Sequence, residues 1–348
     1  MNKSYYKFTK PSKLVASFDL DNTLITTKSG KKFPIDGNDY KYAFDNVEEK
    51  INELIKNDYK IVIFTNQRGI DLKKTNKEDI TNKIEKLFPF ADYFISIKDD
   101  LYRKPMIGMY DKFIELNGKV DKMFYVGDAA GRINDHSYAD INFAYNAGIK
   151  FYTETEYFLG KKEKVKPLCP KQEFKVNQIS DMKKYDSNVI IIMQGFPACG
   201  KTTFIKDYVK HYKISDEDYL HLSNDTHTKS KLKKELKKGI KEEKLIFIDN
   251  TNAAKKNRKD IFDIVNDDDY KVIGIHIMTS MEMAKALNKQ RYYISNMSKN
   301  YKGKVYEKIP IVAYNVFKKK FESMEKDEGF YKIYKYMPDI KLKYCFEI

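Results

Sequence analysis

The feature that most restricts the fold of this chain is an apolar run that ends in a glycine-rich loop. Val189–Met193 is followed by Gly195 and then by Gly200, Lys201 and Thr202, in the pattern Gly-x-x-x-x-Gly-Lys-Thr. A buried strand that passes through such a loop into a helix is typical of a parallel α/β sheet. The second half of the 348 residues is therefore expected to form an α/β domain.

The same loop predicts a binding site for a nucleoside triphosphate. Main-chain N–H groups of the loop and of the helix N-terminus after it would surround the β-phosphate. Lys201 is expected to reach the β- and γ-phosphate oxygens, and Thr202 to ligate Mg²⁺. The predicted ATP-binding residues are Gly195, Gly200, Lys201, Thr202 and Thr203.

A second motif, Asp-x-Asp-x-Thr, ends another apolar run near the N-terminus. Leu14–Phe18 is followed by Asp19 and Asp21. Asp19 is predicted to attack phosphorus as a nucleophile, which divides hydrolysis into two easier steps. Asp21 is predicted to protonate the leaving oxygen and then to activate water, a role that typically contributes about 10²–10⁴-fold. Two carboxylates that face a phosphate need a counterion, and Mg²⁺ prefers such oxygen ligands.

Further polar groups follow the next apolar runs in the order that such a site needs. Thr65 and Asn66 are candidates to hold phosphate oxygens, and Lys104 is a candidate to neutralise the phosphate and the attacking carboxylate. Asp128 ends a run and is a candidate Mg²⁺ ligand. Two more carboxylates follow it, those of Asp135 and Asp140. Each piece alone fits a solvated strand end, but four pieces in series favour a phosphatase.

Residues that could act on the acceptor of the ATP phosphoryl group lie at the ends of later apolar runs. Asp225 is the candidate base that takes a proton from an attacking hydroxyl. Asp249 and Asn252 either contact Mg²⁺ or the acceptor, or cap the next helix. Arg291 lies where a lid would cover the triphosphate, and a solvated arginine is the alternative that the residues alone favour.

The periodicity divides the chain into two doubly wound α/β domains. In residues 1–160, short apolar runs such as Leu14–Phe18 alternate with helix-competent stretches such as Lys77–Leu87. This rhythm restarts in residues 188–348, where Leu245–Ile248 is expected to be a buried strand. Residues 161–187 are rich in lysine and show no period, so they are expected to be a linker. The lysine-rich segment Lys231–Lys244 is interpreted as a solvated helix face rather than a binding surface.

Composition limits the compartment and the partners. The formal net charge of +15 fits a nucleic-acid partner, although the codon bias of an AT-rich genome would also enrich lysine. The sequence has neither a membrane-length apolar run nor a signal peptide, so no membrane partner is expected. Cys169, Cys199 and Cys345 are not spaced for zinc or disulfide pairing, which predicts a reducing, intracellular compartment. Nuclear, mitochondrial and viral-cytoplasmic locations all fit.

The first series of motifs resembles the haloacid dehalogenase superfamily, and the whole chain resembles the bifunctional polynucleotide kinase 3′-phosphatases. The most specific stretches are residues 17–27, 61–67, 101–105, 126–132 and 195–204. The resemblance implies a haloacid-dehalogenase-like 3′-phosphatase followed by a P-loop kinase that uses ATP to phosphorylate 5′-hydroxyl ends.

The resemblance also implies roles for individual residues. It implies that Mg²⁺ is held by Asp19, the main-chain carbonyl of Asp21, and Asp128. It places Arg258 at the acceptor end of the kinase site and Arg291 in the lid.

Three departures from the relatives concern the substrate or the recruitment of the protein. Asn224 stands where the animal enzymes usually carry arginine, which would weaken the hold on the acceptor strand. The segment between Arg132 and Asp135 is short, so one wall of the phosphatase cleft is expected to be trimmed. Too few residues precede Leu14 for a forkhead-associated domain, so recruitment by phosphorylated scaffolds is not expected.

The leading hypothesis is an enzyme of DNA strand-break repair that converts 3′-phosphate and 5′-hydroxyl ends into ends that a ligase can join. RNA end healing is the closest alternative, and the phosphatase-first order favours DNA. A nucleoside kinase fused to a nucleotidase is another alternative. A degenerate scaffold that only binds nucleic-acid ends is a third, but both sites keep their ionisable groups. The protein is expected to be a monomer.

Overall fold

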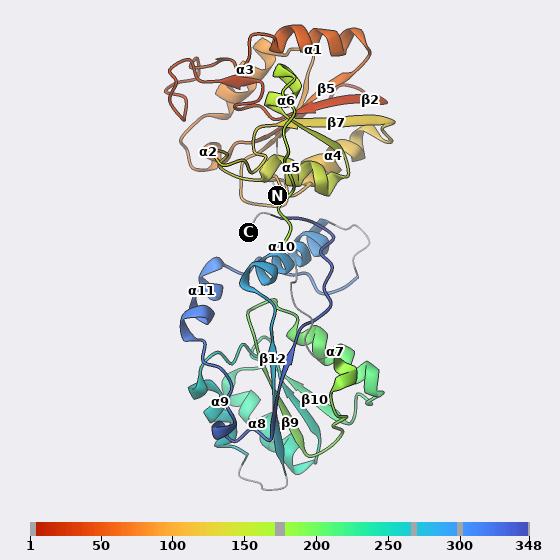
Figure 1. Cartoon of the computed structure of the whole chain (residues 1–348), viewed down its shortest axis with the longest axis vertical. Helices are drawn as coiled ribbons and strands as arrows, with labels where there is room; N and C mark the ends of the chain where they lie inside the picture. The colour runs from red at the N-terminus through yellow and green to blue at the C-terminus, as the bar shows by residue number, and fades with distance from the viewer. Residues whose placement is uncertain (1–4, 171–177, 266–269, 298–301, 347–348) are drawn as a thin grey trace. The chain divides into compact units, whose positions relative to one another are not determined.

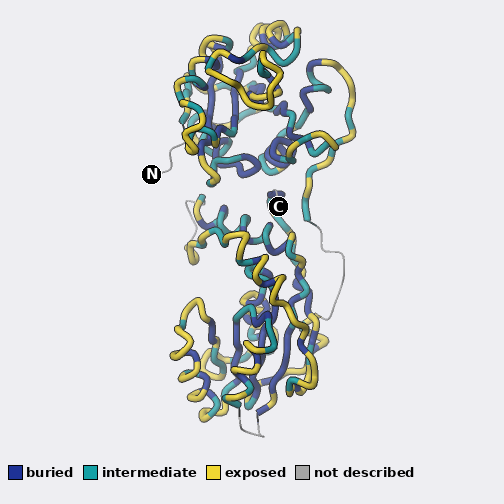
Figure 2. Tube along the Cα trace, turned by 90° about the vertical axis from the view of Figure 1, so that its left-hand side faces the viewer, coloured by how far each residue is buried: buried dark blue, intermediate teal, exposed yellow. Residues whose placement is uncertain are grey.

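The computed structural model describes residues 5–170, 178–265, 270–297 and 302–346. The chain divides into two compact units (Figure 1). Unit 1 comprises Met1–Cys169, Tyr292–Tyr306 and Leu342–Ile348, and unit 2 comprises Pro170–Arg291 and Glu307–Lys341. Buried residues concentrate along the strands of each unit (Figure 2).

Six strands of unit 1 form one sheet. They are β1 (Tyr5–Lys7), β2 (Leu14–Phe18), β5 (Lys60–Asn66), β6 (Asp92–Ser96), β7 (Lys122–Gly127) and β8 (Lys150–Thr153). Their order in space is β1-β6-β5-β2-β7-β8, and all pairs are parallel except β1 with β6. A short hairpin of β3 (Ile25–Thr26) and β4 (Lys41–Tyr42) follows β2.

Helices cover both faces of this sheet because its strands are apolar on both sides. Ala16 and Phe18 of β2 pack with α1 (Val47–Lys56), α3 (Lys77–Leu87) and α6 (Glu154–Leu159). Val15, which points to the opposite face, packs with α4 (Gly108–Asn117) and α5 (Ala139–Ala147). The four-residue helix α2 (Arg68–Asp71) follows β5.

Unit 2 contains a five-stranded, fully parallel sheet. Its strands are β9 (Val189–Gln194), β10 (Tyr219–Leu222), β11 (Leu245–Ile248), β12 (Lys271–Ile277) and β13 (Lys332–Tyr336), in the order β10-β11-β9-β12-β13. One face packs against α7 (Lys201–Tyr212), the first turns of α10 (Met281–Met297) and α11 (Ile311–Lys320). The other face packs against α8 (Lys229–Lys241) and α9 (Lys255–Phe262). Two short 3₁₀ turns, η1 (Ile179–Asp181) and η2 (Lys326–Glu328), complete the unit.

The sequence periodicity located these elements closely. Leu14–Phe18, Leu245–Ile248 and Lys77–Leu87 were expected with the bounds that the structure shows. The two-domain, doubly wound class is confirmed, since each unit is a largely parallel sheet with helices on both faces.

The division into units differs from the expected boundaries at the C-terminal end. Residues 292–306 and 342–348, expected in the second domain, belong to unit 1. The Tyr293 hydroxyl donates to the Asp111 carboxylate, and Phe346 lies in the apolar core of unit 1. In the expected linker, the main chain of Leu168 pairs with the Asn142 side chain. Part of that linker, residues 171–177, lies outside the described residues.

The cysteines also differ from expectation. Cys169 and Cys345 form a disulfide, whereas no pairing was expected. They are 176 residues apart in sequence, so local spacing carries no signal for the bond. The third cysteine, Cys199, is buried and free. Among the residues that the structure describes, no helix has the length and apolarity that a membrane span needs.

Candidate active sites

The first site lies at the C-terminal edge of the unit 1 sheet. Phe18 pairs with Ile63 on one side and with Val126 on the other, so the residues after these strands meet at one edge. Asp19 follows β2, and its main-chain N–H donates to the Val126 carbonyl at 2.9 Å. Asp128 follows β7. The parallel register therefore brings together carboxylates that are distant in sequence.

Lys104 occupies the centre of this site with all three of its ammonium donors used. Its Nζ donates to Asp19 Oδ1 at 2.6 Å, to the Tyr125 hydroxyl at 2.7 Å and to Asp140 Oδ1 at 2.7 Å. Lys104 is only 3% exposed. Burial disfavours its charge, but the Asp140 and Asp19 carboxylates outweigh that effect and raise the pKa of Lys104. The lysine therefore stays cationic beside the predicted nucleophile.

Asp140, at the start of α5, anchors this lysine. Its Oδ1 accepts from Lys104 and from the Tyr125 hydroxyl, and its Oδ2 accepts from the Ala129 N–H at 3.0 Å. Gly127 lets the carboxylate approach the strand end, since a Cβ there would lie 2.5 Å from Asp140 Cγ. Sequence reasoning noted Asp140 only as a nearby carboxylate and missed Tyr125, whose position inside an apolar strand hides its hydroxyl.

The protein alone does not fully compensate negative charge on the carboxylates of Asp19 and Asp128. Burial raises the pKa of Asp19 to about 7, with Lys104 opposing the shift and Asp140 adding to it. Burial, followed by the charges of Asp140 and Asp19, raises the pKa of Asp128 to about 9. Such shifts indicate a place where a cation is needed.

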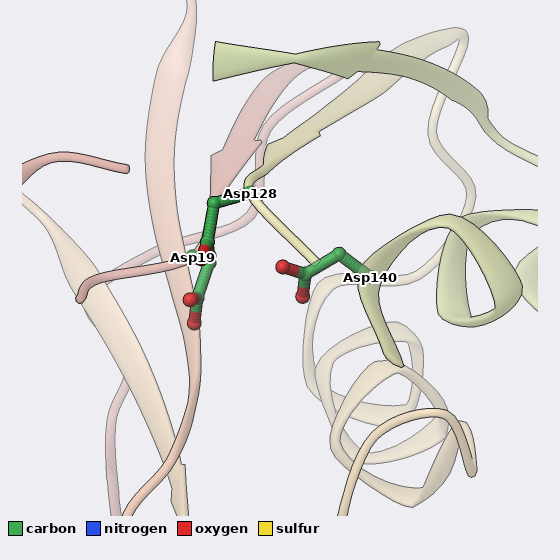
Figure 3. Close-up of side chains that lie close together, drawn as sticks. All are labelled: Asp19, Asp128 and Asp140. Carbon is green, nitrogen blue, oxygen red and sulfur yellow. The ribbon is translucent and has the colours of Figure 1, made fainter. Parts of the chain in front are cut away.

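A divalent cation fits this donor set. Carboxylate oxygens of Asp19, Asp128 and Asp140 lie within 4.8 Å of one another. Figure 3 shows Asp19 and Asp128 close together, with Asp140 reaching toward them from its helix. Because both oxygens of Asp140 already accept hydrogen bonds from the protein, Asp19 and Asp128 are the better-suited metal ligands.

The predicted acid–base residue is held by a neighbouring amide. Gln67 Nε2 donates to Asp21 Oδ2 at 2.6 Å and to Thr65 Oγ1 at 2.9 Å. Thr65 is buried at the end of β5. Gln67, which follows the predicted pair Thr65 and Asn66 in sequence, was not assigned a role and joins the site as a positioning residue.

Asn66 makes a different contact from the predicted one. Its Oδ1 accepts from the Lys104 main-chain N–H at 2.9 Å, and its Nδ2 donates to the Lys104 carbonyl at 3.2 Å. The side chain thus fixes the loop that carries Lys104, so the structure supports positioning rather than direct phosphate contact for Asn66.

The short segment after Asp128 is tied down by Arg132. Its guanidinium contacts Asp135 at 2.9 Å, Glu154 at 3.0 Å and Glu163 at 2.8 Å. Arg132 also donates to the Asp128 carbonyl at 2.8 Å, which links this network to the site.

The second site lies at the C-terminal end of β9, where the glycine-rich loop leads into α7. A Cβ on Gly195 would lie 2.6 Å from Cys199 Sγ, so only glycine permits this close approach. Gly200 precedes α7 with a φ of +104°, which favours glycine. Lys201 Nζ donates to the loop carbonyls of Phe196 at 2.7 Å and Gly195 at 3.2 Å.

Thr202 is linked to the neighbouring strand through a carboxylate. Its Oγ1 donates to Asp249 Oδ2 at 2.5 Å, and His221 Nε2 lies 2.9 Å from the same oxygen. Burial works to raise the pKa of Asp249, but the bonds from His221 and Thr202 outweigh it and lower the pKa. Asp249 therefore belongs to the site rather than acting as a helix cap. His221 was not predicted, because a lone histidine in a strand carries no signal.

Asp225 lies on the turn between β10 and α8, at the same edge of the sheet. The side chain is exposed, and the main-chain N–H of Asp225 donates to Ser223 Oγ at 3.1 Å. The neighbouring Asn224 N–H donates to Asn250 Oδ1 at 2.8 Å. Asp225 is thus accessible to an acceptor hydroxyl.

Arg258 corrects the sequence prediction. It is fully buried, and its guanidinium pairs with the Glu328 carboxylate at 2.7 Å and donates to the Asn252, Glu322 and Ser323 carbonyls. A side chain enclosed in this way does not reach an acceptor strand. Its role is to join α9 to the segment around η2.

Arg291, on α10, lies close enough to Tyr314 for its charge to favour the ionised phenol, against the burial that raises the pKa of Tyr314 to about 12. The Tyr314 ring stacks on Phe196 of the glycine-rich loop, with 6.4 Å between ring centroids. This position beside the loop is compatible with the predicted lid.

Two protein-family models match the chain, one for each half. The model described as polynucleotide kinase 3 phosphatase matches residues 14–158, and that described as chromatin-associated protein KTI12 matches residues 189–326.

Two relatives match most of the chain, across both halves, and a third matches a shorter part. A bifunctional polynucleotide phosphatase/kinase of Schizosaccharomyces pombe is 35% identical over 94% of this chain and 80% of the relative. A putative bifunctional polynucleotide phosphatase/kinase of Acanthamoeba polyphaga mimivirus is 32% identical over 92% of this chain and 83% of the relative. The polynucleotide 3′-phosphatase ZDP of Arabidopsis thaliana is 39% identical over 42% of this chain and 24% of its own length.

Proposed function

The chain belongs to the family of bifunctional polynucleotide phosphatase/kinases, and we propose that it prepares broken DNA ends for ligation. Unit 1 removes a 3′-phosphate, and unit 2 transfers a phosphoryl group from ATP to a 5′-hydroxyl. The observation that carries this proposal is that each unit holds its own set of candidate catalytic groups at a sheet edge. These groups are Asp19, Asp21 and Lys104 in unit 1, and Lys201, Thr202 and Asp225 in unit 2.

In the phosphatase reaction, Asp19 attacks the 3′-phosphorus and forms an aspartyl phosphate, while Asp21 protonates the departing 3′-oxygen. Asp21 then takes a proton from the water that cleaves this intermediate. Gln67 keeps Asp21 oriented for both steps through its 2.6 Å hydrogen bond. Lys104 stabilises negative charge on the transferring group, and Thr65 binds its oxygens. Mg²⁺ held by Asp19, the Asp21 carbonyl and Asp128 would supply additional positive charge.

In the kinase reaction, the glycine-rich loop binds the phosphates of ATP. Lys201 exchanges its bonds to the loop carbonyls for bonds to phosphate oxygens, because a charged partner forms the stronger hydrogen bond. Thr202 and Asp249 are the groups suited to Mg²⁺, which would neutralise the triphosphate. Asp225 takes the proton of the attacking 5′-hydroxyl. Arg291 stabilises the transferring phosphoryl group.

The proposed substrate is a DNA strand rather than a free nucleotide. The phosphatase-first order and the net charge of +15 support this substrate. We also propose that the enzyme acts as a monomer inside the cell.

An end-labelled assay tests the proposal directly. DNA and RNA oligonucleotides with a 3′-phosphate or a 5′-hydroxyl are compared with the corresponding mononucleotides, with ATP and Mg²⁺ present or omitted. We expect turnover of both ends, with kcat/KM higher on DNA than on RNA and higher on oligonucleotides than on mononucleotides. Equal efficiency on mononucleotides would overturn the polynucleotide assignment, and faster turnover of RNA would reassign the substrate.

A further inference from the structure

Helix α8 carries a dense set of exposed lysines. Its thirteen residues run from Lys229 to Lys241, and Leu232, Leu236 and Gly239 face the core. The seven lysines all lie on the exposed surface: Lys229, Lys231, Lys233, Lys234, Lys237, Lys238 and Lys241. Lys234, Lys237 and Lys241 follow one another at i, i+3 and i+7, so they form a row along the side opposite the apolar residues.

This arrangement does not serve the stability of the helix. No acidic residue occupies the first turn, where lysine opposes the helix dipole. Lys233, Lys237 and Lys241 repeat at i, i+4 spacing, where like charges repel. Within the described part of the chain, Lys238 alone of the seven has a carboxylate within salt-bridge distance, Glu242 at 3.6 Å. An external anion would relieve this repulsion.

The N-terminus of α8 follows closely after the proposed kinase acceptor site. Asp225 lies four residues before α8, and Thr228 caps the helix by accepting a hydrogen bond from the Lys231 N–H at 3.3 Å. The helix then runs antiparallel to β10 and β11, away from the edge of the sheet that carries Asp225 and Asp249. A strand whose 5′-hydroxyl reaches Asp225 can therefore continue along this helix.

We propose that the lysine face of α8 binds the phosphodiester backbone of the acceptor strand on the 3′ side of its 5′-hydroxyl. This inference rests on the proposed kinase function. A helix of this length extends roughly 20 Å, which spans about five or six phosphates at ~3.4 Å per nucleotide. Because the contacts are to phosphates, the surface binds without regard to base sequence. This role replaces the interpretation of Lys231–Lys244 as a solvated helix face. It also supplies charged contacts to the acceptor strand, which Asn224 cannot make because it lacks the charge of an arginine.

The test measures binding separately from turnover. The triple variant Lys234→Gln, Lys237→Gln, Lys241→Gln is compared with wild type by fluorescence anisotropy, using 5′-hydroxyl DNA oligonucleotides of increasing length over a series of salt concentrations. We expect Kd for the longest strand to rise about 10-fold or more. The slope of log K against log salt should fall by about 2, since each single-strand phosphate contact contributes ~0.7.

A matched control removes the same charge elsewhere in unit 2. Lys318, Lys319 and Lys320 lie exposed in the last turn of α11, and their joint substitution by glutamine is expected to leave Kd and the salt slope near wild type. Circular dichroism confirms that each variant is folded, and a Lys→Arg version of the α8 variant is expected to restore binding.

Three results would overturn the proposal. The α8 glutamine variant could keep the Kd and the salt slope of wild type, or the α8 and α11 variants could lose affinity equally. The affinity of the wild-type protein could also fail to increase with the length of the strand. Failure of the proposed function has a different signature. In that case wild-type protein would not phosphorylate any 5′-hydroxyl end, whereas the binding measurements would still decide the role of α8.

Discussion

The two sites prepare for a phosphate in opposite ways. In unit 1 the cation and its counter-charges are assembled in advance, with Lys104 enclosed by Asp19, Asp140 and the Tyr125 hydroxyl. In unit 2 the cation is Lys201, which donates hydrogen bonds to two uncharged partners, the main-chain carbonyls of its own loop. The first site therefore holds its lysine against carboxylates of the protein, whereas in the second site the anionic partner of Lys201 is left to the nucleotide.

This difference follows from the chemistry at each site. In the proposed mechanism, the carboxylate of Asp19 has to remain close to a phosphate that repels it, so a buried lysine beside Asp19 is needed throughout the reaction. ATP brings several negative charges of its own, and a loop of N–H groups is sufficient to receive them. We expect the two sites to differ accordingly when single groups are removed.

Removal of the central group from each site should separate the two activities most strongly. Asp19→Ala should lower 3′-phosphatase activity on the order of 10⁴-fold or more, because no covalent intermediate can form. Lys201→Ala should lower kinase activity about 10²–10³-fold through loss of charge stabilisation. Each variant serves as the control for the other in assays of both activities. Parallel loss of both activities in either variant would show that the sites are coupled.

The exposed carboxylate of unit 2 is expected to affect turnover without affecting nucleotide binding. Asp225→Asn should lower kinase kcat about 10²-fold or more, because the acceptor hydroxyl loses its base. Titration with a fluorescent ATP analogue should give a wild-type Kd, since Asp225 is not part of the glycine-rich loop. Wild-type kcat in this variant would remove Asp225 from the base role.

The buried carboxylates of unit 1 should make its stability depend on Mg²⁺. The pKa of Asp128, about 9, lies above the ordinary value of 3.8, so the contribution of Asp128 to metal-free stability is fully present below pH 3.8 and is lost as pH rises toward 9. Asp128→Asn should therefore raise the Tm of metal-free protein at about pH 8 and abolish the increase in Tm that Mg²⁺ produces in wild type. Calorimetry with EDTA or Mg²⁺ measures both effects, and Asp225→Asn is the control. An unchanged response to Mg²⁺ would argue against Asp128 as a ligand.

Unit 2 should show a smaller pH effect of the opposite sign. Burial, aided by the charges of Lys335 and Arg258, lowers the pKa of His276 from 6.5 to about 4. The folded state thus disfavours the protonated ring, and stability is lost as pH falls from about 6.5 toward 4. In His276→Gln, the fall in the Tm of unit 2 between pH 7 and about 5 should be smaller than in wild type by a few degrees. A wild-type pH profile in the variant would assign the acid sensitivity to other groups.

Much of the fold was predictable because local periodicity and local motifs carry it. The bounds of β2, β11 and α3 follow from apolar runs and helical spacing, and the catalytic candidates lie at strand ends, where a parallel sheet brings them together. The supporting groups were harder to find. Tyr125 and His221 lie within strands, where an aromatic ring is expected to serve packing, and only their partners reveal a polar role.

The sequence by itself determined two α/β domains and their order, and it located the candidate nucleophile and the candidate phosphate-binding loop, because each of these depends on residues that are close together in the chain. Tertiary structure decided which distant residues support them. Arg258 is enclosed by Glu328 and main-chain carbonyls rather than facing an acceptor. Asp140 holds Lys104, and Cys345 pairs with Cys169. Such partners come from segments far apart in the chain, so their pairing is set by packing and leaves no local pattern to recognise.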